Sequence, residues 1–215
     1  MIDKCTTKSW ETSLYEPQQL YYNLMGEKIL TDKNVKSAYY MAKYKKSCDS
    51  PAWDGMTRTI LIDGMEQEHA LALIRYHILH GPSGCVKRFD IPKSNGKTRP
   101  ISIYPLLDRV AQWCIMEPLR KACGPLLSPI NHAFLKGKSC KTAFDAFPPA
   151  GEAGYVICGD IHSFFDSVSH SLVRACLWSA GIRDSQLLHA INVTLKTPYK
   201  YPKQPKVRPE QGLPQ

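Results

Sequence analysis

The chain has 215 residues, of which 43% are hydrophobic and 22% are charged. This is enough apolar material for one large domain or two small ones, and it excludes a disordered chain, which is poorer in aromatic and aliphatic residues. No run approaches the ~18–20 consecutive apolar residues of a membrane helix, and residues 1–10 contain no apolar block typical of a secretory signal. We therefore expect a protein of the cytosol or nucleus, most simply cytoplasmic, with no membrane partner.

The charge is strongly basic. The 28 Lys and Arg residues outnumber the 19 Asp and Glu residues, which gives a formal net charge of +9. Such a surplus favours a polyanionic partner, nucleic acid first. The eight cysteines form no C-x-x-C pair, and several, such as Cys114 and Cys158, lie within apolar stretches. This pattern favours reduced core thiols over zinc ligands or disulfides.

Helical periodicity dominates the first third of the chain. Apolar residues three and four positions apart predict helices over 16–28 and 34–46. The clearest helix spans 66–80 and is ended by Gly81-Pro82.

Residues 85–104 have a different pattern. Two runs with β-branched residues flank Asn95-Gly96, a pair that permits the positive φ angles of a tight hairpin turn. A helix over 108–123 follows, bent or restarted at Pro118.

The last third is expected to begin with a short buried strand over 154–161. Helices over 169–180 and 185–195 follow, and a Pro- and Lys-rich tail ends the sequence. The order of helices, hairpin, helix, strand and helices favours an α+β architecture over alternating βαβ units.

The hairpin carries the first candidate site. Lys93 precedes the turn and Arg99 follows it, so both lie near one end of the ribbon. An ammonium and a guanidinium there suit a triphosphate or a nucleic-acid backbone. An ordinary solvated hairpin is the alternative.

Asp160 is the second candidate. A carboxylate at the end of a buried strand, followed by Phe164-Phe165, is a common way to hold a divalent cation, although it could instead cap the next turn. Asp166 is a weaker candidate for the same role, and we expect it to cap the following helix instead. The tail over 196–208 has five basic residues, no acid and two interleaved tyrosines, which suits contact with a nucleic-acid backbone and bases, or a plain surface loop.

Six segments, in order, resemble the conserved blocks of reverse transcriptases, particularly those encoded by bacterial group II introns. They are Asp54-Gly55-Met56-Thr57, Ile91 to Pro100 (IPKSNGKTRP), Asp108 to Gln112 (DRVAQ), Phe134 with Gly137-Lys138-Ser139 and Ala143, Asp160 to Asp166 (DIHSFFD) with His170 and Leu172, and Gln211 to Gln215 (QGLPQ). The resemblance covers residues 54–215, whereas the first fifty residues match loosely.

The resemblance implies a right-hand polymerase fold with a helix-rich N-terminal part, a basic β-hairpin and an incomplete antiparallel palm sheet. It places fingers at 1–112, an incomplete palm at 113–167, and a truncated second fingers segment at 168–215 that returns toward the palm. It also implies that Asp160 is the first ligand of catalytic Mg²⁺ and that the backbone carbonyl of Ile161 completes that metal's shell.

Four further positions inherit nucleotide-binding roles from the resemblance. Lys93 and Arg99 would hold the triphosphate of the incoming dNTP. Phe164 would exclude a ribose 2′-hydroxyl, a role that a different alignment gives to Phe165. Gln215 would contact the sugar of the incoming nucleotide.

The sequence departs from the family pattern in three places. Ala133-Phe134-Leu135 stands where Gly-Phe-Arg is usual, and His162-Ser163 replaces the commoner Lys-Gly. No Tyr-x-Asp-Asp segment occurs in the 215 residues, so two of the three expected metal carboxylates are absent. We expect this fragment alone to be inactive.

The implied function is RNA-directed DNA synthesis, with two Mg²⁺ ions, dNTPs, an RNA template and a DNA primer, together with assistance to splicing and mobility through intron RNA. Two alternatives stay open: a non-enzymatic RNA-binding module on a polymerase-like fold, and a reverse transcriptase of a retron, a diversity-generating element or a phage-defence system. An unpaired edge of the 154–161 strand would also invite self-association.

Overall fold

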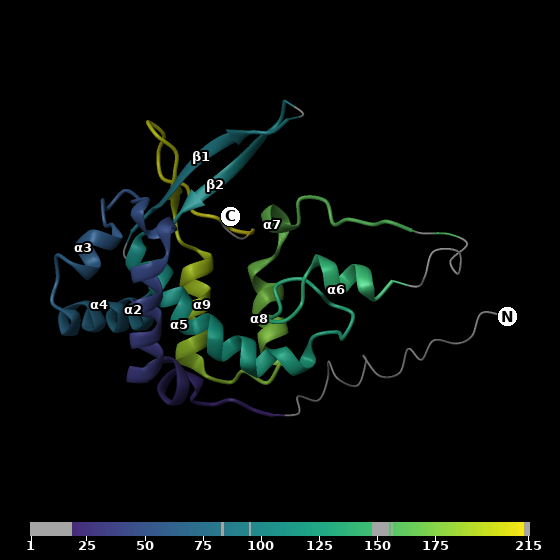
Figure 1. The fold of residues 1–215 in the computed structure, drawn as a ribbon, viewed down its shortest axis with the longest axis horizontal. Coiled ribbons are helices and arrows are strands. Elements are labelled where there is room, and N and C mark those ends of the chain that lie inside the picture. The colour runs from purple at the N-terminus through teal and green to yellow at the C-terminus, as the bar shows by residue number, and fades with distance from the viewer. Residues whose placement is uncertain (1–18, 83, 95, 148–154, 156, 213–215) are drawn as a thin grey trace.

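The computed structural model describes residues 19–82, 84–94, 96–147, 155 and 157–212. These form a helical body with a projecting β-hairpin (Figure 1). The elements are, in chain order, η1 (Met25–Ile29), α2 (Asp32–Tyr44), η2 (Lys46–Asp49), α3 (Arg58–Ile62), α4 (Gln67–His80), β1 (Val86–Pro92), β2 (Thr98–Ile103), α5 (Leu106–Cys123), η3 (Gly124–Leu126), α6 (Cys140–Asp145), α7 (Phe164–Ser167), α8 (His170–Ser179), α9 (Ser185–Leu195) and β3 (Tyr199–Lys200).

The hydrophobic core lies where α2, α4, α5 and α9 pack together. On α4 the buried side chains recur at helical spacing and include Ala70, Ile74 and Ile78, as the sequence pattern predicts. Gly81 ends this helix with φ +80°. The helices predicted over 34–46, 66–80, 169–180 and 185–195 are thus confirmed within one or two residues.

The helix predicted over 16–28 is only partly testable, and its described portion is wrong. Residues 16–18 lie outside the described residues, and the described portion has only the five-residue π-helix η1. Tyr21 instead forms an isolated bridge with Ile182, because its backbone exchanges hydrogen bonds with Gly181 and Arg183. Tertiary pairing therefore prevails over local helical periodicity here.

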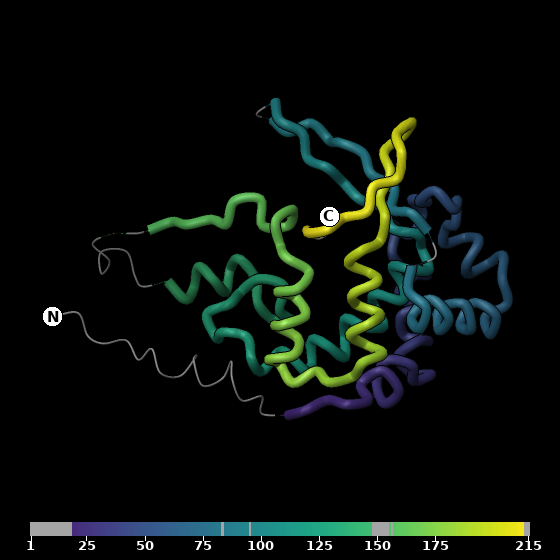
Figure 2. Tube along the Cα trace, turned by 180° about the vertical axis from the view of Figure 1, so that it is seen from behind, coloured from purple at the N-terminus to yellow at the C-terminus, as the bar shows by residue number. Residues whose placement is uncertain are grey.

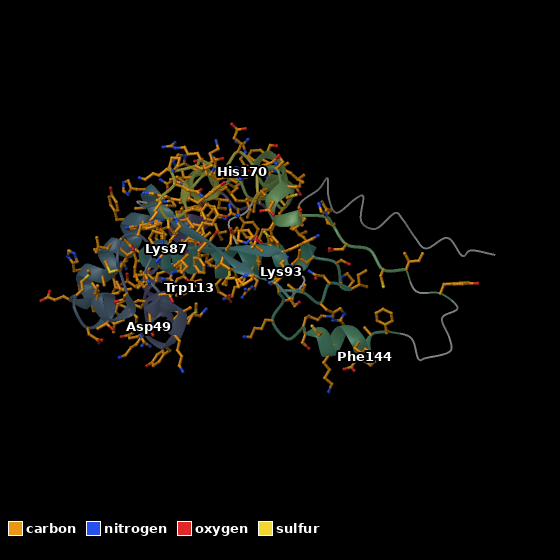
Figure 3. All side chains as sticks on the ribbon, turned by 90° about the horizontal axis from the view of Figure 1, so that it is seen from above. Asp49, Lys87, Lys93, Trp113, Phe144 and His170 are labelled. Carbon is orange, nitrogen blue, oxygen red and sulfur yellow. The ribbon has the colours of Figure 1, made fainter. Side chains whose placement is uncertain are left out.

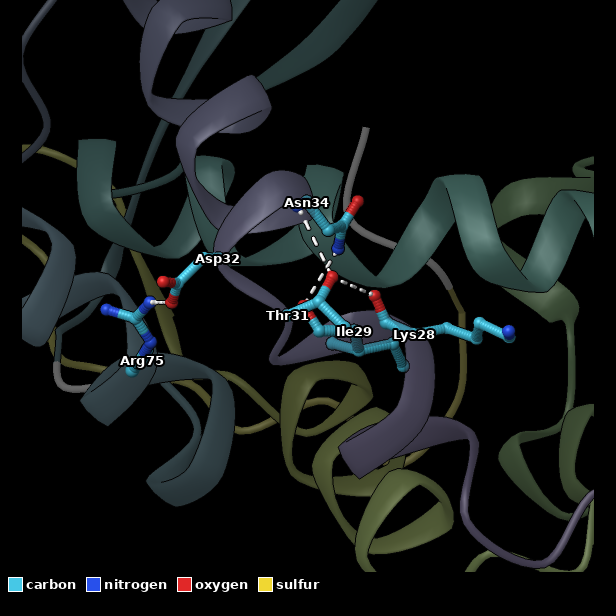
Figure 4. Close-up of polar contacts among 6 residues, drawn as sticks. All are labelled: Lys28, Ile29, Thr31, Asp32, Asn34 and Arg75. Atoms are coloured by element: carbon cyan, nitrogen blue, oxygen red, sulfur yellow. Dashed lines mark hydrogen bonds and ion pairs between the residues drawn. The ribbon is translucent and has the colours of Figure 1, made fainter.

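Polar contacts fix the junction between η1 and α2 (Figure 4). Thr31 caps α2 by accepting a hydrogen bond from the backbone N–H of Asn34. The Asn34 amide donates to the carbonyl of Ile29 and to that of Cys114 on α5, each at 2.8 Å. Arg75 on α4 pairs with Asp32 at the start of α2. These contacts join the start of α2 to η1, α5 and α4.

The hairpin forms where the Asn-Gly pair predicts it. β1 and β2 pair antiparallel, and Gly96 has φ +75° in the turn. β3 then adds a parallel partner to β1, with Val86 opposite Tyr199 and Lys87 opposite Lys200. The sheet order is therefore β2-β1-β3. The tail that contains β3 turns back toward α7 beneath the hairpin (Figures 1 and 2).

Helix α5 runs continuously through Pro118, so it does not restart at this residue. Its start, Leu106, lies two residues before the predicted one. Pro118 is itself buried, and α5 packs along α2 and α4.

The buried strand predicted over 154–161 is wrong for the residues that the structure describes. Residues 155 and 157–161 have no strand conformation, and Tyr155 and Ile157 are 96% and 97% exposed. A strand is stable only when its backbone groups pair with a neighbour, and among the described residues none pairs with this segment. Cys158, predicted to be a core thiol, is consequently exposed.

The sequence contains no apolar run long enough for a membrane helix, and the helices can be compared with that expectation. Among the helices of the described residues, none is both long enough and apolar enough to cross a bilayer.

Candidate functional site

A pocket of about 310 Å³ lies at the foot of the hairpin, between β1, α7, β3 and the tail. Strand, helix and tail come from positions far apart in the sequence and meet here (Figure 2). Its polar lining residues are Arg88, Asp166, Tyr199, Arg208, Glu210 and Gln211.

Arg88 on β1 contacts residues from two other sides of this pocket, β3 and α7. Its guanidinium carbon lies 4.5 Å from the centre of the Tyr199 ring, and its Nη2 lies 3.8 Å from Oδ1 of Asp166. The side chain is 13% exposed, and its Nε has no hydrogen-bond partner among the described residues. A buried donor left unsatisfied costs free energy, so this Nε suits an oxygen of a bound ligand.

Asp166 therefore differs from its expected role as a helix cap. The N-cap of α8 is Ser169, and it has no side-chain capping bond. Asp166 lies within α7 and faces Arg88 instead. Its spacing from the expected metal ligand gave no sign of this contact, which needs β1 and α7 to be placed in space.

The tail is anchored beside α7 through Gly212. Its N–H donates to the Val168 carbonyl and its own carbonyl lies 2.8 Å from Nε2 of buried His170. Gly212 has φ +85°, and a Cβ at this position would lie 2.9 Å from the carbonyl oxygen of Asp166. Only glycine fits this close approach, which gives the Gln-Gly pair of the tail a physical reason.

The two tail tyrosines have partners within the protein. The backbones of Tyr199 and Val207 exchange two hydrogen bonds of 2.9 Å. The Tyr201 hydroxyl donates to Oδ1 of Asp90 at 3.2 Å. This part of the tail is thus an ordered extension of the sheet, with the Tyr199 ring occupied by Arg88.

Lys93 and Arg99 lie together at the distal end of the ribbon. Arg99 is opposite Ile91 in the register, and the Lys93 N–H bonds to the Lys97 carbonyl at 2.7 Å. Figure 3 shows Lys87 near the body and Lys93 farther along the hairpin. Neither Lys93 nor Arg99 lines the pocket. Lys93 follows the end of β1 and is five residues beyond Arg88, a span of about 17 Å for extended backbone.

Asp160 and Ile161 precede α7 in an exposed segment and do not line this pocket either. Phe164 and Phe165 are 46% and 40% exposed and pack edge to face, with ring centres 5.6 Å apart. Gln215 lies outside the described residues. The structure therefore brings the tail and α7 together with the hairpin's base, and none of Asp160, Lys93 and Arg99 lines the pocket that they form.

The donor set can be compared with what Mg²⁺ requires. The Asp160 carboxylate and the Ile161 carbonyl are hard oxygen donors of the kind that Mg²⁺ prefers. The described residues contain no group of three His, Cys, Asp or Glu side chains that could hold a metal ion. The chemistry of these donors fits, but they are an incomplete set.

Ser163 has a backbone conformation that glycine adopts more easily. It precedes α7 with φ +48° and ψ +39°, the left-handed region. This is one of the two positions at which the sequence departs from the usual Lys-Gly. The left-handed backbone is thus present without the glycine, at a cost of about 1 kcal/mol or more.

The Asp108-to-Gln112 block holds the body together. Oδ1 of buried Asp108 lies 2.6 Å from Nδ1 of His77 on α4. Arg109 donates to the carbonyls of Ser47 and Ser50, and its burial lowers the pKa of the guanidinium. These contacts hold α5 against α4 and the η2 segment. No residue of the Asp108-to-Gln112 block lines the pocket.

Comparison with known proteins assigns the chain to a family. Residues 91–215, more than half of the chain, match the family described as reverse transcriptase (RNA-dependent DNA polymerase). Protein YkfC of Escherichia coli is 31% identical over 163 residues, 70% of this chain and 41% of that protein. The group II intron-encoded protein LtrA of Lactococcus lactis is 28% identical over 116 residues, 53% of this chain and 19% of LtrA.

Other matches are weaker or shorter. An uncharacterised 91 kDa protein in the cob intron of Schizosaccharomyces pombe is 31% identical over 53% of this chain and 14% of its own length. A solved Cas6-RT-Cas1–Cas2 complex aligns with 87% of this chain and 19% of its own, at 20% identity and a TM-score of 0.46. The chain spans less than half the length of these relatives. From the match over residues 91–215, the chain belongs to the reverse transcriptase family.

Proposed function

We propose that this chain supplies the nucleotide- and template-binding part of an RNA-directed DNA polymerase that extends a DNA primer with dNTPs on an RNA template. The observation that carries the proposal is the pocket at the foot of the hairpin. There, α7 from the Asp160-to-Asp166 block and the Gln211-Gly212 tail lie against β1 of the basic hairpin. Two of the family's sequence blocks thus line one pocket, together with Arg88 from the strand that leads into the Ile91-to-Pro100 block.

The cationic ribbon has the triphosphate-binding role. Lys93 and Arg99 are exposed at its distal end, where they would hold the dNTP phosphates as the hairpin closes over the nucleotide. Fixed positive charge stabilises a transferring phosphoryl group without forming bonds to it. Phe164, or its neighbour Phe165, would lie against the sugar and exclude a 2′-hydroxyl, and Gln215 would contact the same sugar.

Asp160 and the Ile161 carbonyl would hold Mg²⁺ in the complete enzyme, which uses two ions. Bound Mg²⁺ would activate the primer hydroxyl and neutralise charge on the phosphates. Since the 215 residues contain no Tyr-x-Asp-Asp segment, further carboxylates have to come from outside these residues, and we propose that this chain alone is inactive.

In this proposal residues 1–112 are fingers, 113–167 are part of the palm, and 168–215 are a second fingers segment that returns to it. The likeness to LtrA, named as a group II intron-encoded protein, supports a further role in splicing and mobility through binding of intron RNA. The location we propose is the cytoplasm.

Primer extension tests the catalytic assignment. The full-length product should extend a DNA primer on an RNA template with dNTPs and Mg²⁺, and Asp160→Ala should lower the rate by a factor of about 10³ or more, because oxygen ligands of the metal are lost. Asp145→Ala, an exposed carboxylate on α6, is the matched control and should leave the rate unchanged.

Two results would contradict the assignment. Synthesis by the Asp160→Ala protein at the wild-type rate would remove Asp160 from the metal site. RNA binding without any synthesis by the full-length product would instead favour a non-enzymatic RNA-binding module.

A further inference from the structure

A second surface lies on the face of the β1–β3 pair that does not contain the pocket. Residues alternate between the two faces of a strand, so Arg88 and Lys87 point to opposite sides of β1. Arg88 and Tyr199 contact each other on the pocket side. On the other side, Lys87 and Lys200 both lie against the ring of Trp53, which comes from the loop before α3.

Trp53 is an exposed aromatic ring close to two cations. It is 43% exposed, and its ring centre lies 5.7 Å from Nζ of Lys87 and 5.5 Å from Nζ of Lys200. These distances fall near the outer limit of a cation–π contact, about 6 Å. Both ammonium groups thus lie near the ring, and part of its surface stays open to solvent.

The arrangement brings two like charges together. Lys87 and Lys200 are direct partners in the parallel register of β1 and β3, and like charges opposite each other in a sheet are destabilising. Within the described part of the chain, neither lysine forms an ion pair with a carboxylate. Lys206 adds a third cation nearby, since both it and Lys200 act on the pKa of Cys85. A bound anion would relieve this repulsion.

We infer that Trp53, Lys87 and Lys200 form a binding site for single-stranded RNA. A partly open ring with two ammonium groups beside it can stack a base while the neighbouring phosphates are neutralised. A duplex offers no unstacked base to such a ring, and an acidic protein segment would not need the ring. The inference rests on the proposed function for the choice of RNA, and it adds a contact surface outside the pocket.

Binding of a labelled oligouridylate of about a dozen nucleotides, followed by fluorescence anisotropy, tests this site on the 215-residue chain. Trp53→Ala should weaken binding about tenfold, within the range for loss of one stacked base, and Trp53→Phe should retain most of the affinity. Replacing Lys87 and Lys200 by Gln should reduce the slope of log affinity against log salt by about 0.7 per lysine.

The matched control is Trp178→Ala. Trp178 on α8 is 53% exposed and has Arg183 stacked 3.9 Å from its ring, so it also pairs an exposed ring with a cation. The Trp178→Ala substitution should leave RNA affinity unchanged. If Trp53→Ala does not fold, as shown by circular dichroism, the lysine variants keep the test intact, because both lysines lie only partly buried on the surface.

Three outcomes would overturn the inference. They are wild-type RNA affinity in the Trp53→Ala protein, an equal loss with a duplex of the same length, and displacement of the RNA by oligoglutamate of equal charge at equal concentration. The primer-extension test is independent of all three. If Trp53→Ala leaves RNA affinity unchanged while Asp160→Ala abolishes synthesis, only this inference is wrong. If Trp53→Ala weakens RNA binding while Asp160→Ala synthesises at the wild-type rate, only the catalytic assignment is wrong.

Discussion

Burial separates the cysteines into two chemical groups. Cys48, Cys85 and Cys114 are buried, whereas Cys140 and Cys176 are exposed. Burial raises the pKa of the Cys114 thiol to about 12, and the nearby Arg75 opposes this only in part. Since the thiolate is the reactive form, Cys114 is both protonated and inaccessible at neutral pH.

Alkylation with iodoacetamide at about pH 8, with each cysteine followed by peptide mass spectrometry, measures this difference. We expect Cys140, Cys158 and Cys176 to react in the native protein and Cys114 to stay unmodified until urea unfolds the chain. Rapid native modification of Cys114 would mean that α5 does not bury it. All cysteines should react in the unfolded control.

At the scale of elements, α4 and α9 meet at a glycine. Gly81 ends α4 with φ +80° and ψ −173°, a region essentially restricted to glycine. A Cβ at this position would lie 2.7 Å from Cγ1 of Val193 on α9. The helix end thus requires glycine both for its backbone and for its packing.

Gly81→Ala should lower the free energy of unfolding by about 3 kcal/mol, as the sum of backbone strain and overpacking. Gly96→Ala is the matched control, because Gly96 has φ +75° and a Cβ there would have no atom within 4 Å. The control substitution should cost only about 1 kcal/mol, the backbone part. Urea denaturation measures both, and equal losses would contradict the predicted contact with Val193.

At the scale of the whole molecule, the chain divides into a packed body and an extended arm. The core cluster draws its buried residues from 24–122 and 182–190. Of the described residues between 124 and 169, none is buried. Large apolar side chains are exposed here, among them Phe144 at 78% and Ile157 at 97%. Apolar surface of this extent is typical of an interaction face.

We therefore expect the 215-residue chain to self-associate as its concentration rises, as light scattering would show. The cause differs from the unpaired strand edge predicted from the sequence, because these residues are apolar and exposed without strand conformation. Phe144→Ser with Ile157→Ser should reduce association and leave the melting temperature unchanged. A strict monomer at high concentration would contradict the expectation.

The features that could be predicted from the sequence are those set by interactions between residues close together in the chain. The hairpin and four helices follow from local patterns, since glycine turns and apolar spacing act over a few residues. The strand over 154–161 failed because its apolar pattern needs a pairing partner. Sequence patterns placed Lys93 and Arg99 at one end of the ribbon, but gave Arg88 no role, because its contacts lie 78 and 111 positions away on Asp166 and Tyr199.

The sequence by itself determined the family blocks, the basic charge and the locally coded elements. Only the tertiary structure decided that the tail pairs with β1, that Arg88 faces Asp166, and that Lys87 and Lys200 both lie near the Trp53 ring. The physical reason is that side chains alternate between the two faces of a strand, so the sequence fixes the face on which each one lies. The neighbour that it meets on that face depends on which distant segment pairs with the strand.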